Sequence, residues 1–283
     1  MSSDAIKETI SQNVEQWDWE NPPMPPTDLI FDDGEPLESN RHRIAMNVLI
    51  RSLQQAWGDS PNSDSFASRN DFFTGGNMFV YYNSAQARNR DFRGPDFFVV
   101  LDVDGTIPRQ GWVVWDEGGR YPDVIVELMS PSTAEVDTTT KKDIYERVFK
   151  TRNYFVFDPF NPASLQGWRL DDNLRYQLIA PDERGWLWCQ TLGFWLGTWE
   201  GTIDRETAVW LRFYDDSGNL ILLPEEAAQA KAEEERQQAE QEKQRAEQER
   251  QRAEQERQKA EQEKQRADRL AEQLRTLGIN PEV

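Results

Sequence analysis

The residues best suited to chemistry lie in one stretch, Arg120–Tyr145, which reads RYPDVIVELMSPSTAEVDTTTKKDIY. Its apolar run, Val124–Met129, is rich in β-branched residues and is interrupted by one acid, Glu127. A short run of this kind predicts a buried strand. A carboxylate inside such a strand is costly to bury unless another group pairs with it. Glu127 is therefore either a functional acid or one half of a buried ion pair.

A basic partner for this acid is found in the segment that follows. After Ser-Pro-Ser-Thr a helical pattern begins, and there Lys141 shares one face with Ile144, Tyr145 and Val148, at spacings of three, four and seven residues. We expect Ile144 and Val148 to turn this face toward the sheet and Tyr145 to pack in the core. Lys141 is then carried inward with them, whereas Lys142 falls on the flank.

A second acid, Asp96, stands directly after Pro95 at the start of another strand-like run. If the two strands are neighbours, the carboxylates of Asp96 and Glu127 meet. Two carboxylates with room for water and phosphate oxygens suit Mg²⁺, and a metal held there can activate water for phosphodiester cleavage. A nearby lysine can neutralise the charge that develops or orient the attacking water. The structural alternative is that Glu127 and Lys141 form a buried ion pair while Asp96 caps its strand.

The charge balance restricts the kinds of partner the protein can bind. The chain has 51 acids and 32 bases, a net charge of −19, and the tail from Glu225 onward holds 16 of the acids and 12 of the bases. The rest of the chain therefore carries a net charge of −15. An acidic protein repels a phosphate backbone unless metal ions or a local basic patch intervene. Arg88, Arg90 and Arg93, just before Asp96, form the best candidate for such a patch.

Two residues that occur only once limit the other mechanisms. Cys189 is the only cysteine, which excludes an intrachain disulfide and a cysteine-rich zinc site and is consistent with a reducing compartment. His42 is the only histidine, so any Ser-His-Asp or Cys-His mechanism would have to use it. The N-terminal segment lacks the pattern of a secretory signal, and no apolar run approaches the roughly 20 residues that span a bilayer. We therefore expect a soluble, cytoplasmic protein.

Three regions are predicted along the chain. Residues 1–37 are polar and rich in proline, which is typical of an extended arm. Residues 38–224 alternate helical and strand-like patterns, and their strand–helix–strand order predicts a mixed α/β sheet flanked by helices, followed by a β-rich extension. The first helix is expected at Arg41–Trp57. The expected strands are Phe72–Tyr82, which Gly75-Gly76 interrupts, Phe97–Val103, Trp112–Trp115, Val124–Met129, Tyr154–Phe157, Trp168–Leu170, Tyr176–Ile179, Trp186–Cys189, Phe194–Trp199, Leu211–Tyr214 and Leu220–Leu223.

The third region, residues 225–283, has a different composition. Seven-residue units such as AEQEKQR repeat in register from Ala239, Ala246, Ala253 and Ala260. This repeat of Ala, Glu, Gln, Lys and Arg predicts one long helix. If alanine takes the a position, glutamate takes the d position, which makes a poor coiled-coil seam until the leucines of Leu270–Leu277. A solvated charged helix and a dimerising coiled coil both remain open.

Together these motifs resemble the Uma family of restriction endonucleases, which is abundant in cyanobacteria and is placed in the PD-(D/E)XK nuclease superfamily. PDVIVELMSPST, the acid and lysine after it, and YFVFDP carry the resemblance, along with NRHRIAMNVLIRSL and GPDFFVV upstream. It covers roughly Asp28 to Leu223, and the heptad tail is similar to tails of some members. The resemblance implies a restriction-endonuclease-like fold, Mg²⁺ or Mn²⁺ as cofactor, and DNA as substrate.

The resemblance also implies roles for individual residues. It implies Asp96 as the first metal-binding acid and Glu127 as the second. The lysine of the superfamily would stand two residues after the second acid, where this chain has Met129. In the Uma family the lysine lies in the following helix, and Lys141 matches it by its four-residue spacing from Asp137. The predicted catalytic set is therefore Asp96, Glu127 and Lys141, with Asp137 supporting the start of the helix.

Several other residues have weaker claims. His42 is expected to pack on the first helix, with a functional role as the alternative, and Glu38 could be a further metal ligand or an acid at the helix N-terminus. Asp123 repeats the Pro-Asp pattern but lies four residues from Glu127 on one strand, about 13 Å away, so Asp96 is preferred. The four tryptophans of the β-rich section could stack bases, although core packing is the simpler interpretation. These are Trp186, Trp188, Trp195 and Trp199.

The favoured hypothesis is a metal-dependent DNA endonuclease that hydrolyses phosphodiester bonds with two carboxylates and a lysine. The alternative is a catalytically silent nuclease-fold scaffold whose helical tail mediates protein–protein interaction, including formation of a homodimer. The net charge and the low-complexity tail favour this alternative. A third possibility, a different metal-dependent phosphodiesterase or an RNA nuclease, would use the same residues.

Overall fold

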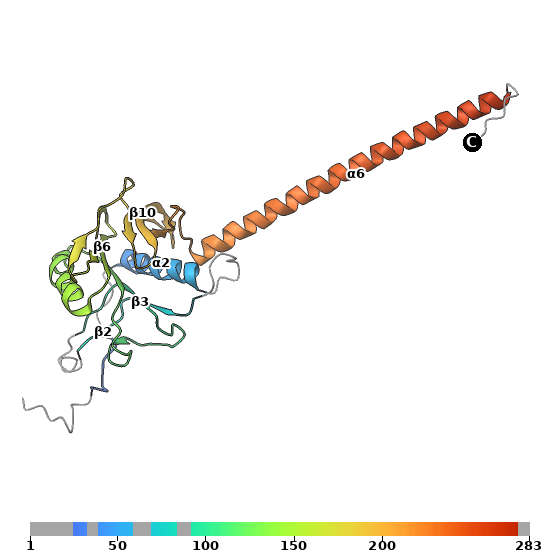
Figure 1. The fold of residues 1–283 in the computed structure, drawn as a ribbon. Helices are drawn as coiled ribbons and strands as arrows, with labels where there is room; N and C mark the ends of the chain where they lie inside the picture. Colours follow the sequence, from blue (N-terminus) through green and yellow to red (C-terminus); the bar gives the residue numbers. More distant parts are fainter. Residues whose placement is uncertain (1–24, 33–38, 59–68, 84–91, 277–283) are drawn as a thin grey trace, which may run out of the picture. The chain divides into compact units, whose positions relative to one another are not determined.

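A computed structural model describes residues 25–32, 39–58, 69–83 and 92–276 of the chain (Figure 1). The chain divides into two compact units, Met1–Leu223 and Pro224–Val283. The first unit is a mixed α/β domain built on a six-stranded sheet, as the sequence predicts. The sheet has the order β1-β3-β5-β6-β7-β8, with β5 and β6 parallel and the other neighbours antiparallel. Its strands are Phe72–Gly75, Phe97–Leu101, Val124–Leu128, Asn153–Asp158, Asn161–Leu170 and Tyr176–Leu178.

Two layers cover one face of this sheet. The first is helix α2 (Asn40–Trp57), whose apolar residues Ile44, Leu49 and Leu53 are buried against the sheet. The second is a three-stranded antiparallel sheet of β9 (Leu187–Cys189), β10 (Phe194–Ile203) and β11 (Glu206–Tyr214). Both layers share one core with the sheet residues, so the predicted β-rich extension is integrated into the domain. Its first strands, β7 and β8, extend the main sheet itself.

The opposite face is covered by the helical segment that joins β5 to β6, drawn in green in Figure 1. This segment alternates α-helical and π-helical turns, whose hydrogen bonds run from i to i+5 in the π turns. Its parts are α4 (Ala134–Val136), η1 (Asp137–Lys141), α5 (Lys142–Ile144) and η2 (Tyr145–Phe149). The sequence prediction that Val148 points inward is wrong: its side chain is 44% exposed, and Phe149 is 3% exposed instead. A π turn holds an extra residue, which shifts the buried position by one.

Two further sequence expectations can be compared with the structure. The aromatic segment 72–82 is interrupted after Gly75, as predicted, and its two strands belong to different sheets: β1 pairs with β3, whereas β2 (Val80–Tyr81) pairs with β4 (Trp112–Val113). Gly75 ends β1 beneath the ring of Phe98, where a Cβ atom would lie only 2.2 Å from that ring. The strand expected at Leu220–Leu223 is reduced to a single bridge between Leu220 and Tyr214.

The second unit contains one helix, α6 (Pro224–Thr276), which confirms the prediction of a long C-terminal helix. None of its described side chains is buried. The seven-residue repeat places side-chain contacts along its surface at constant spacing, with Gln amides donating to Glu carboxylates four residues earlier. Of the helices that the structure describes, none has the length and apolar character needed to cross a membrane.

Candidate active site

Strands β3 and β5 bring the two predicted acids together. They pair antiparallel with Phe97 opposite Val126, so one further step of the register places Asp96 opposite Glu127. The Oδ2 atom of Asp96 accepts a hydrogen bond from the backbone N–H of Leu128, at 2.8 Å. Asp96 therefore extends the pairing of the two strands through its side chain, which is the contact expected of the structural alternative, in which Asp96 caps its strand. The same hydrogen bond fixes its carboxylate beside that of Glu127.

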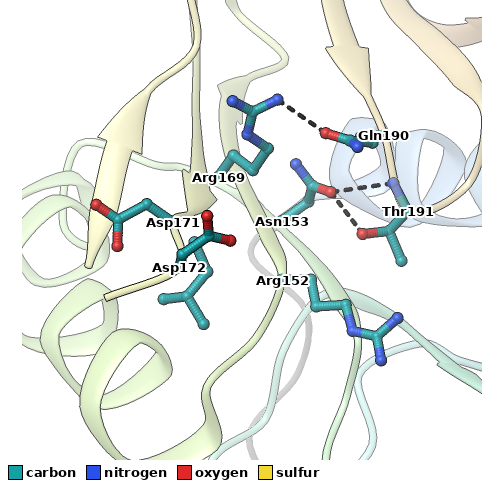
Figure 2. A pocket seen from close by; sticks show the side chains of 8 residues that line it. Arg152, Asn153, Arg169, Asp171, Asp172, Gln190 and Thr191 are labelled. Atoms are coloured by element: carbon teal, nitrogen blue, oxygen red, sulfur yellow. Dashed lines mark hydrogen bonds between the residues drawn. The ribbon is translucent and has the colours of Figure 1, made fainter. Parts of the chain in front are cut away.

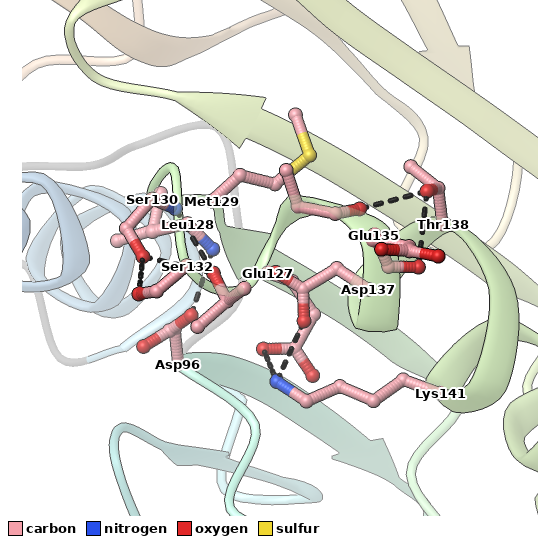
Figure 3. A network of polar contacts seen from close by, with 12 residues as sticks. Asp96, Glu127, Leu128, Met129, Ser130, Ser132, Glu135, Asp137, Thr138 and Lys141 are labelled. Atoms are coloured by element: carbon pink, nitrogen blue, oxygen red, sulfur yellow. Dashed lines mark hydrogen bonds and ion pairs between the residues drawn. The ribbon is translucent and has the colours of Figure 1, made fainter.

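Glu127 is fully buried in β5 and has two partners from the following helical segment. The ammonium of Lys141 lies 3.0 Å from its Oε2 atom, and the hydroxyl of Tyr145 donates to its Oε1 atom at 2.7 Å. Figure 3 shows the lysine reaching this carboxylate from the helical segment. The buried carboxylate of Glu127 thus has the partner that its burial requires, and it has two of them, Lys141 and Tyr145.

Lys141 is shared between two carboxylates. Its Nζ atom lies 2.8 Å from Oδ1 of Asp137, four residues earlier, as well as close to Glu127 (Figure 3). Asp137 is almost fully buried, and its backbone carbonyl accepts a hydrogen bond from Tyr154 in β6. The π turn that contains both residues is therefore tied to the sheet at one end and to Glu127 at the other. These contacts hold the lysine in one place.

The turn between β5 and the helical segment is also fixed. The hydroxyl of Thr133 accepts a hydrogen bond from the backbone N–H of Ser130 at 2.9 Å, and the hydroxyls of Ser130 and Ser132 lie 2.9 Å apart. Hydroxyl side chains stabilise tight turns in this way. The Ser-Pro-Ser-Thr segment thereby sets the position of the helical segment relative to Glu127.

The site holds more negative than positive charge. Asp96, Glu127 and Asp137 supply three carboxyl groups, and among the residues that the structure describes Lys141 is the one cation in contact with them. Burial raises the pKa of Asp96 well above its ordinary value, and the neighbouring charge of Glu127 raises it further. Burial by itself lowers the pKa of Lys141, but the charges of Glu127 and Asp137 outweigh it and raise that pKa. At neutral pH Lys141 is therefore a cation.

The donor set fits a divalent cation. The carboxylates of Asp96 and Glu127 face each other with an excess of negative charge that Lys141 neutralises only in part. Mg²⁺ is held by one or two carboxylates and keeps several waters. Within the described residues no group of three or more His, Cys, Asp or Glu side chains is arranged as metal ligands. The protein would thus supply two ligands and leave the other positions to water and substrate.

The remaining candidates lie elsewhere or serve the fold. Asp123 is at the opposite end of β5, where arginines pair with it. His42 is buried: its Nε2 atom lies 3.2 Å from the carbonyl of Met129, which can only accept, and its Nδ1 atom lies 2.8 Å from the hydroxyl of Ser39. The histidine therefore packs as expected and joins α2 to the end of β5. Glu38, Arg88 and Arg90 lie outside the described residues.

Arg93 and the four tryptophans have contacts within the domain. Arg93 lies 5.7 Å from the ring of Tyr82 and donates to the carbonyl of Phe92. The tryptophan rings pack on other rings or on guanidinium groups, which agrees with a packing role. Trp186 stacks on Tyr214, Trp188 packs on Trp195, and Trp199 lies beside Arg212.

Sequence reasoning underestimated two residues of this site. Tyr145 packs in the core as predicted, yet its hydroxyl also holds Glu127. Asp137 was expected only to support the start of the helix, but it contacts the amine of Lys141. A signal for both was present in the sequence, because Asp137, Lys141 and Tyr145 recur every four residues. Polar groups on an inward-facing helical stripe need one another as partners.

Comparison with known proteins identifies the family to which the chain is similar. Residues 15–202 match the family model Uma2, described as putative restriction endonuclease. The chain is also similar to a crystal structure of a putative nuclease belonging to DUF820 from Anabaena variabilis ATCC 29413. The two are 11% identical, the match covers 60% of this chain and 86% of the other, and the TM-score is 0.38. No curated protein matches the chain.

Proposed function

This chain belongs to the Uma2 family of putative restriction endonucleases, and we propose that it is a metal-dependent DNA endonuclease that hydrolyses phosphodiester bonds. One observation supports the proposal most strongly. Asp96 and Glu127 face each other across neighbouring strands, and the amine of Lys141 lies 3.0 Å from Glu127. Two adjacent carboxylates with one lysine are the groups that metal-assisted phosphodiester hydrolysis needs.

Each residue has a distinct role in this proposal. Asp96 and Glu127 would hold Mg²⁺ or Mn²⁺, which when bound would lower the pKa of water and stabilise the charge on the phosphate. Lys141 places a positive charge where the substrate phosphate becomes more negative, and it can donate a hydrogen bond to the attacking water. Because its pKa is raised, Lys141 does not act as a general base at neutral pH. Tyr145 fixes the orientation of Glu127 through its hydroxyl.

The charge of the site explains why metal should be required. Three carboxyl groups against one lysine repel a DNA phosphate when no other cation is present. The whole chain has a net charge of −19, which adds to the repulsion. A divalent cation held there would offset this excess of negative charge at the point where the phosphate must enter. Substrate binding and catalysis should therefore depend on the same ion.

Cleavage of supercoiled plasmid by the purified full-length protein tests this proposal. We expect nicking with Mg²⁺ or Mn²⁺ and none in EDTA, and we expect Glu127→Ala and Lys141→Ala to lose it. Lys142→Ala is the matched control, because Lys142 is adjacent in sequence but its amine lies over the ring of Trp168. It should keep activity close to that of the wild type. Equal loss in both lysine variants would contradict the assigned role of Lys141.

The choice between DNA and RNA is tested in the same assay. The family description favours DNA, so duplex DNA, single-stranded DNA and single-stranded RNA of one sequence are compared at equal concentration. We expect metal-dependent cleavage of DNA to be the fastest. If the wild type cleaved RNA faster than DNA and Glu127→Ala did not cleave RNA, the assigned catalytic residues would stand and the substrate would be RNA.

A second candidate function, a scaffold that acts through its tail, is favoured by one observation. None of the described side chains of α6 is buried, although leucines recur toward its end. If the tail forms a homodimer, Leu270→Lys combined with Leu274→Lys should convert dimer to monomer in sedimentation equilibrium. A folded wild type that dimerises in this way but cleaves none of the substrates would support the scaffold. Cleavage that persists in the monomeric variant would assign the chemistry to the first unit.

A further inference from the structure

A polar pocket lies where β6 begins, on the other side of the sheet from Glu127. It has a volume of about 610 Å³ and is formed by three segments (Figure 2). Asn153 is paired with Val124, three residues before Glu127 on the neighbouring strand, so the two side chains lie on opposite faces. We call this the β6 pocket. The residues that matter in it are Arg152, Asn153, Arg169, Asp172, Gln190 and Thr191.

The amide of Asn153 is held in one orientation. Its Oδ1 atom accepts hydrogen bonds from the backbone N–H of Thr191, at 3.2 Å, and from the Thr191 hydroxyl, at 2.7 Å. Only the oxygen can accept from a backbone N–H, which assigns the other terminal atom as the nitrogen. That Nδ2 atom is buried and has no acceptor in the described protein. In Figure 2 it points away from Thr191, on the side where Arg169 lies.

Further donors line the same pocket. The guanidinium of Arg169 uses Nη1 to donate to Gln190, at 2.8 Å, which orients it over the pocket. Arg152 lies at the edge, where its side chain is 61% exposed and its Nε atom is 3.4 Å from Asp123. Asp171 keeps its negative charge, but its carboxylate oxygens already accept hydrogen bonds from its own turn and from Gln177. Asp172 is exposed to solvent.

We propose that the β6 pocket binds a small anionic molecule through Asn153 and Arg169, with Arg152 at the edge. The buried Nδ2 atom of Asn153 requires an acceptor, and the oriented guanidinium of Arg169 has further N–H groups to donate beside it. An anionic oxygen satisfies both donors best. The volume exceeds that of a free phosphate ion and suits a phosphate or carboxylate carried on a larger molecule, such as a mononucleotide. The pocket lies on the opposite sheet face from Asp96 and Glu127 and does not depend on nuclease activity.

Isothermal titration calorimetry of the full-length protein in EDTA tests this inference. The probes are adenosine monophosphate, adenosine, inorganic phosphate and citrate, so that phosphate, carboxylate and the uncharged nucleoside are compared. We expect at least one anionic probe to bind, and adenosine to bind at least about tenfold more weakly than adenosine monophosphate. A stronger response to citrate than to either phosphate would identify the ligand as a carboxylate.

Two variants and two controls locate the binding. Asn153→Asp keeps an oxygen for Thr191 but replaces the donor by a negative charge, and Arg169→Gln removes the oriented guanidinium; each should weaken binding at least about tenfold. Arg147→Gln removes an equally exposed arginine outside the pocket and should leave affinity unchanged, as should Glu127→Ala. If Asn153→Asp fails to fold, Arg169→Gln decides alone. Absence of binding by every anionic probe at about 10 mM, equal binding of adenosine and its monophosphate, or undiminished binding in Arg169→Gln would overturn the proposal.

Discussion

The two ends of the β3–β5 strand pair carry the same local motif and differ in their surroundings. Each strand is preceded by Pro-Asp, in Pro95-Asp96 and Pro122-Asp123. Each aspartate accepts a backbone hydrogen bond from the opposite strand: Asp96 from Leu128 at 2.8 Å, and Asp123 from Leu101 at 2.9 Å. The two contacts are related by the approximate twofold symmetry of an antiparallel pair.

The charges around the two aspartates are opposite in sign. Burial raises the pKa of Asp123, but the hydrogen bond from Leu101 and the charges of Arg152 and Arg120, at 3.4 and 3.7 Å, limit that rise. Asp96 faces Glu127, and both burial and that neighbouring charge raise its pKa. One motif thus serves the fold where arginines neutralise it and forms a candidate active site where they do not. The difference lies in the neighbours, because the backbone is the same.

The largest expected effect is on cleavage. Asp96→Asn should lower the rate of metal-dependent plasmid nicking at least about 100-fold, because one of two charged metal ligands is lost. Asp123→Asn removes the same charge at the other end, keeps an oxygen for Leu101, and should leave the rate within about twofold. Rates are compared at equal protein and Mg²⁺ concentration. Similar losses in both variants would show that the two ends are not functionally distinct.

The next effect is stabilisation by metal, measured without any substrate. At Mg²⁺ concentrations about 100 times the dissociation constant, the free energy of unfolding of the wild type should rise by about 2.7 kcal/mol. Urea denaturation with Mg²⁺ and with EDTA measures the change. Asp96→Asn and Glu127→Gln should lose most of this gain, whereas Asp123→Asn should retain it. A full gain in Asp96→Asn would place the metal elsewhere.

A smaller effect is expected from the hydroxyl of Tyr145, which has no counterpart beside Asp123. Tyr145→Phe should slow nicking about tenfold, because groups that orient a metal ligand typically contribute this much. The free energy of unfolding should fall by only about 1 kcal/mol, the contribution of one hydrogen bond. Tyr121→Phe, which removes a hydroxyl near the Asp123 end, is the matched control. If both variants slowed nicking equally, Tyr145 would have no special role.

The smallest expected effect is on the pH dependence of the free energy of unfolding. Because the folded pKa of Asp96 lies above its ordinary value of 3.8, the folded protein binds the proton more tightly than the unfolded chain. The stability that this group contributes is therefore greatest at acid pH and falls as the pH rises from about 4 toward the folded pKa. In EDTA, the wild type should lose stability relative to Asp96→Asn across this range. A constant difference between the two denaturation curves would contradict the raised pKa.

Much of this comparison could be predicted from the sequence. The periodicity of two in strands placed Asp123 and Glu127 on one face, and the Pro-Asp motif marked the start of β3. The adjacency of β3 and β5 could only be assumed, because strand order depends on contacts between residues far apart in the chain. The structure brings Asp96, Glu127 and Lys141 together; their catalytic roles remain predictions.

The helical segment shows where sequence reasoning fails. A regular period of 3.6 residues predicts Val148 on the buried face, but two π turns bury Phe149 instead. π turns have no clear sequence signature, and here they accompany buried polar contacts of Asp137 and Lys141. The lack of an acceptor for the Nδ2 atom of Asn153 could not be predicted from the sequence either, because the burial of this side chain depends on the loop before β10. Such features follow from tertiary contacts and not from local pattern.

The repeat in α6 has a consequence for how this protein can evolve. Each unit of seven residues corresponds to 21 nucleotides, and near-identical tandem units in a gene are prone to gain or loss by replication slippage. One unit changes the helix by about 10 Å and rotates its end by only about 20°, since seven residues are close to two full turns. None of the described helix side chains is buried, so such changes do not disturb a core. The length of the tail can therefore change in uniform steps without altering the core of the first unit.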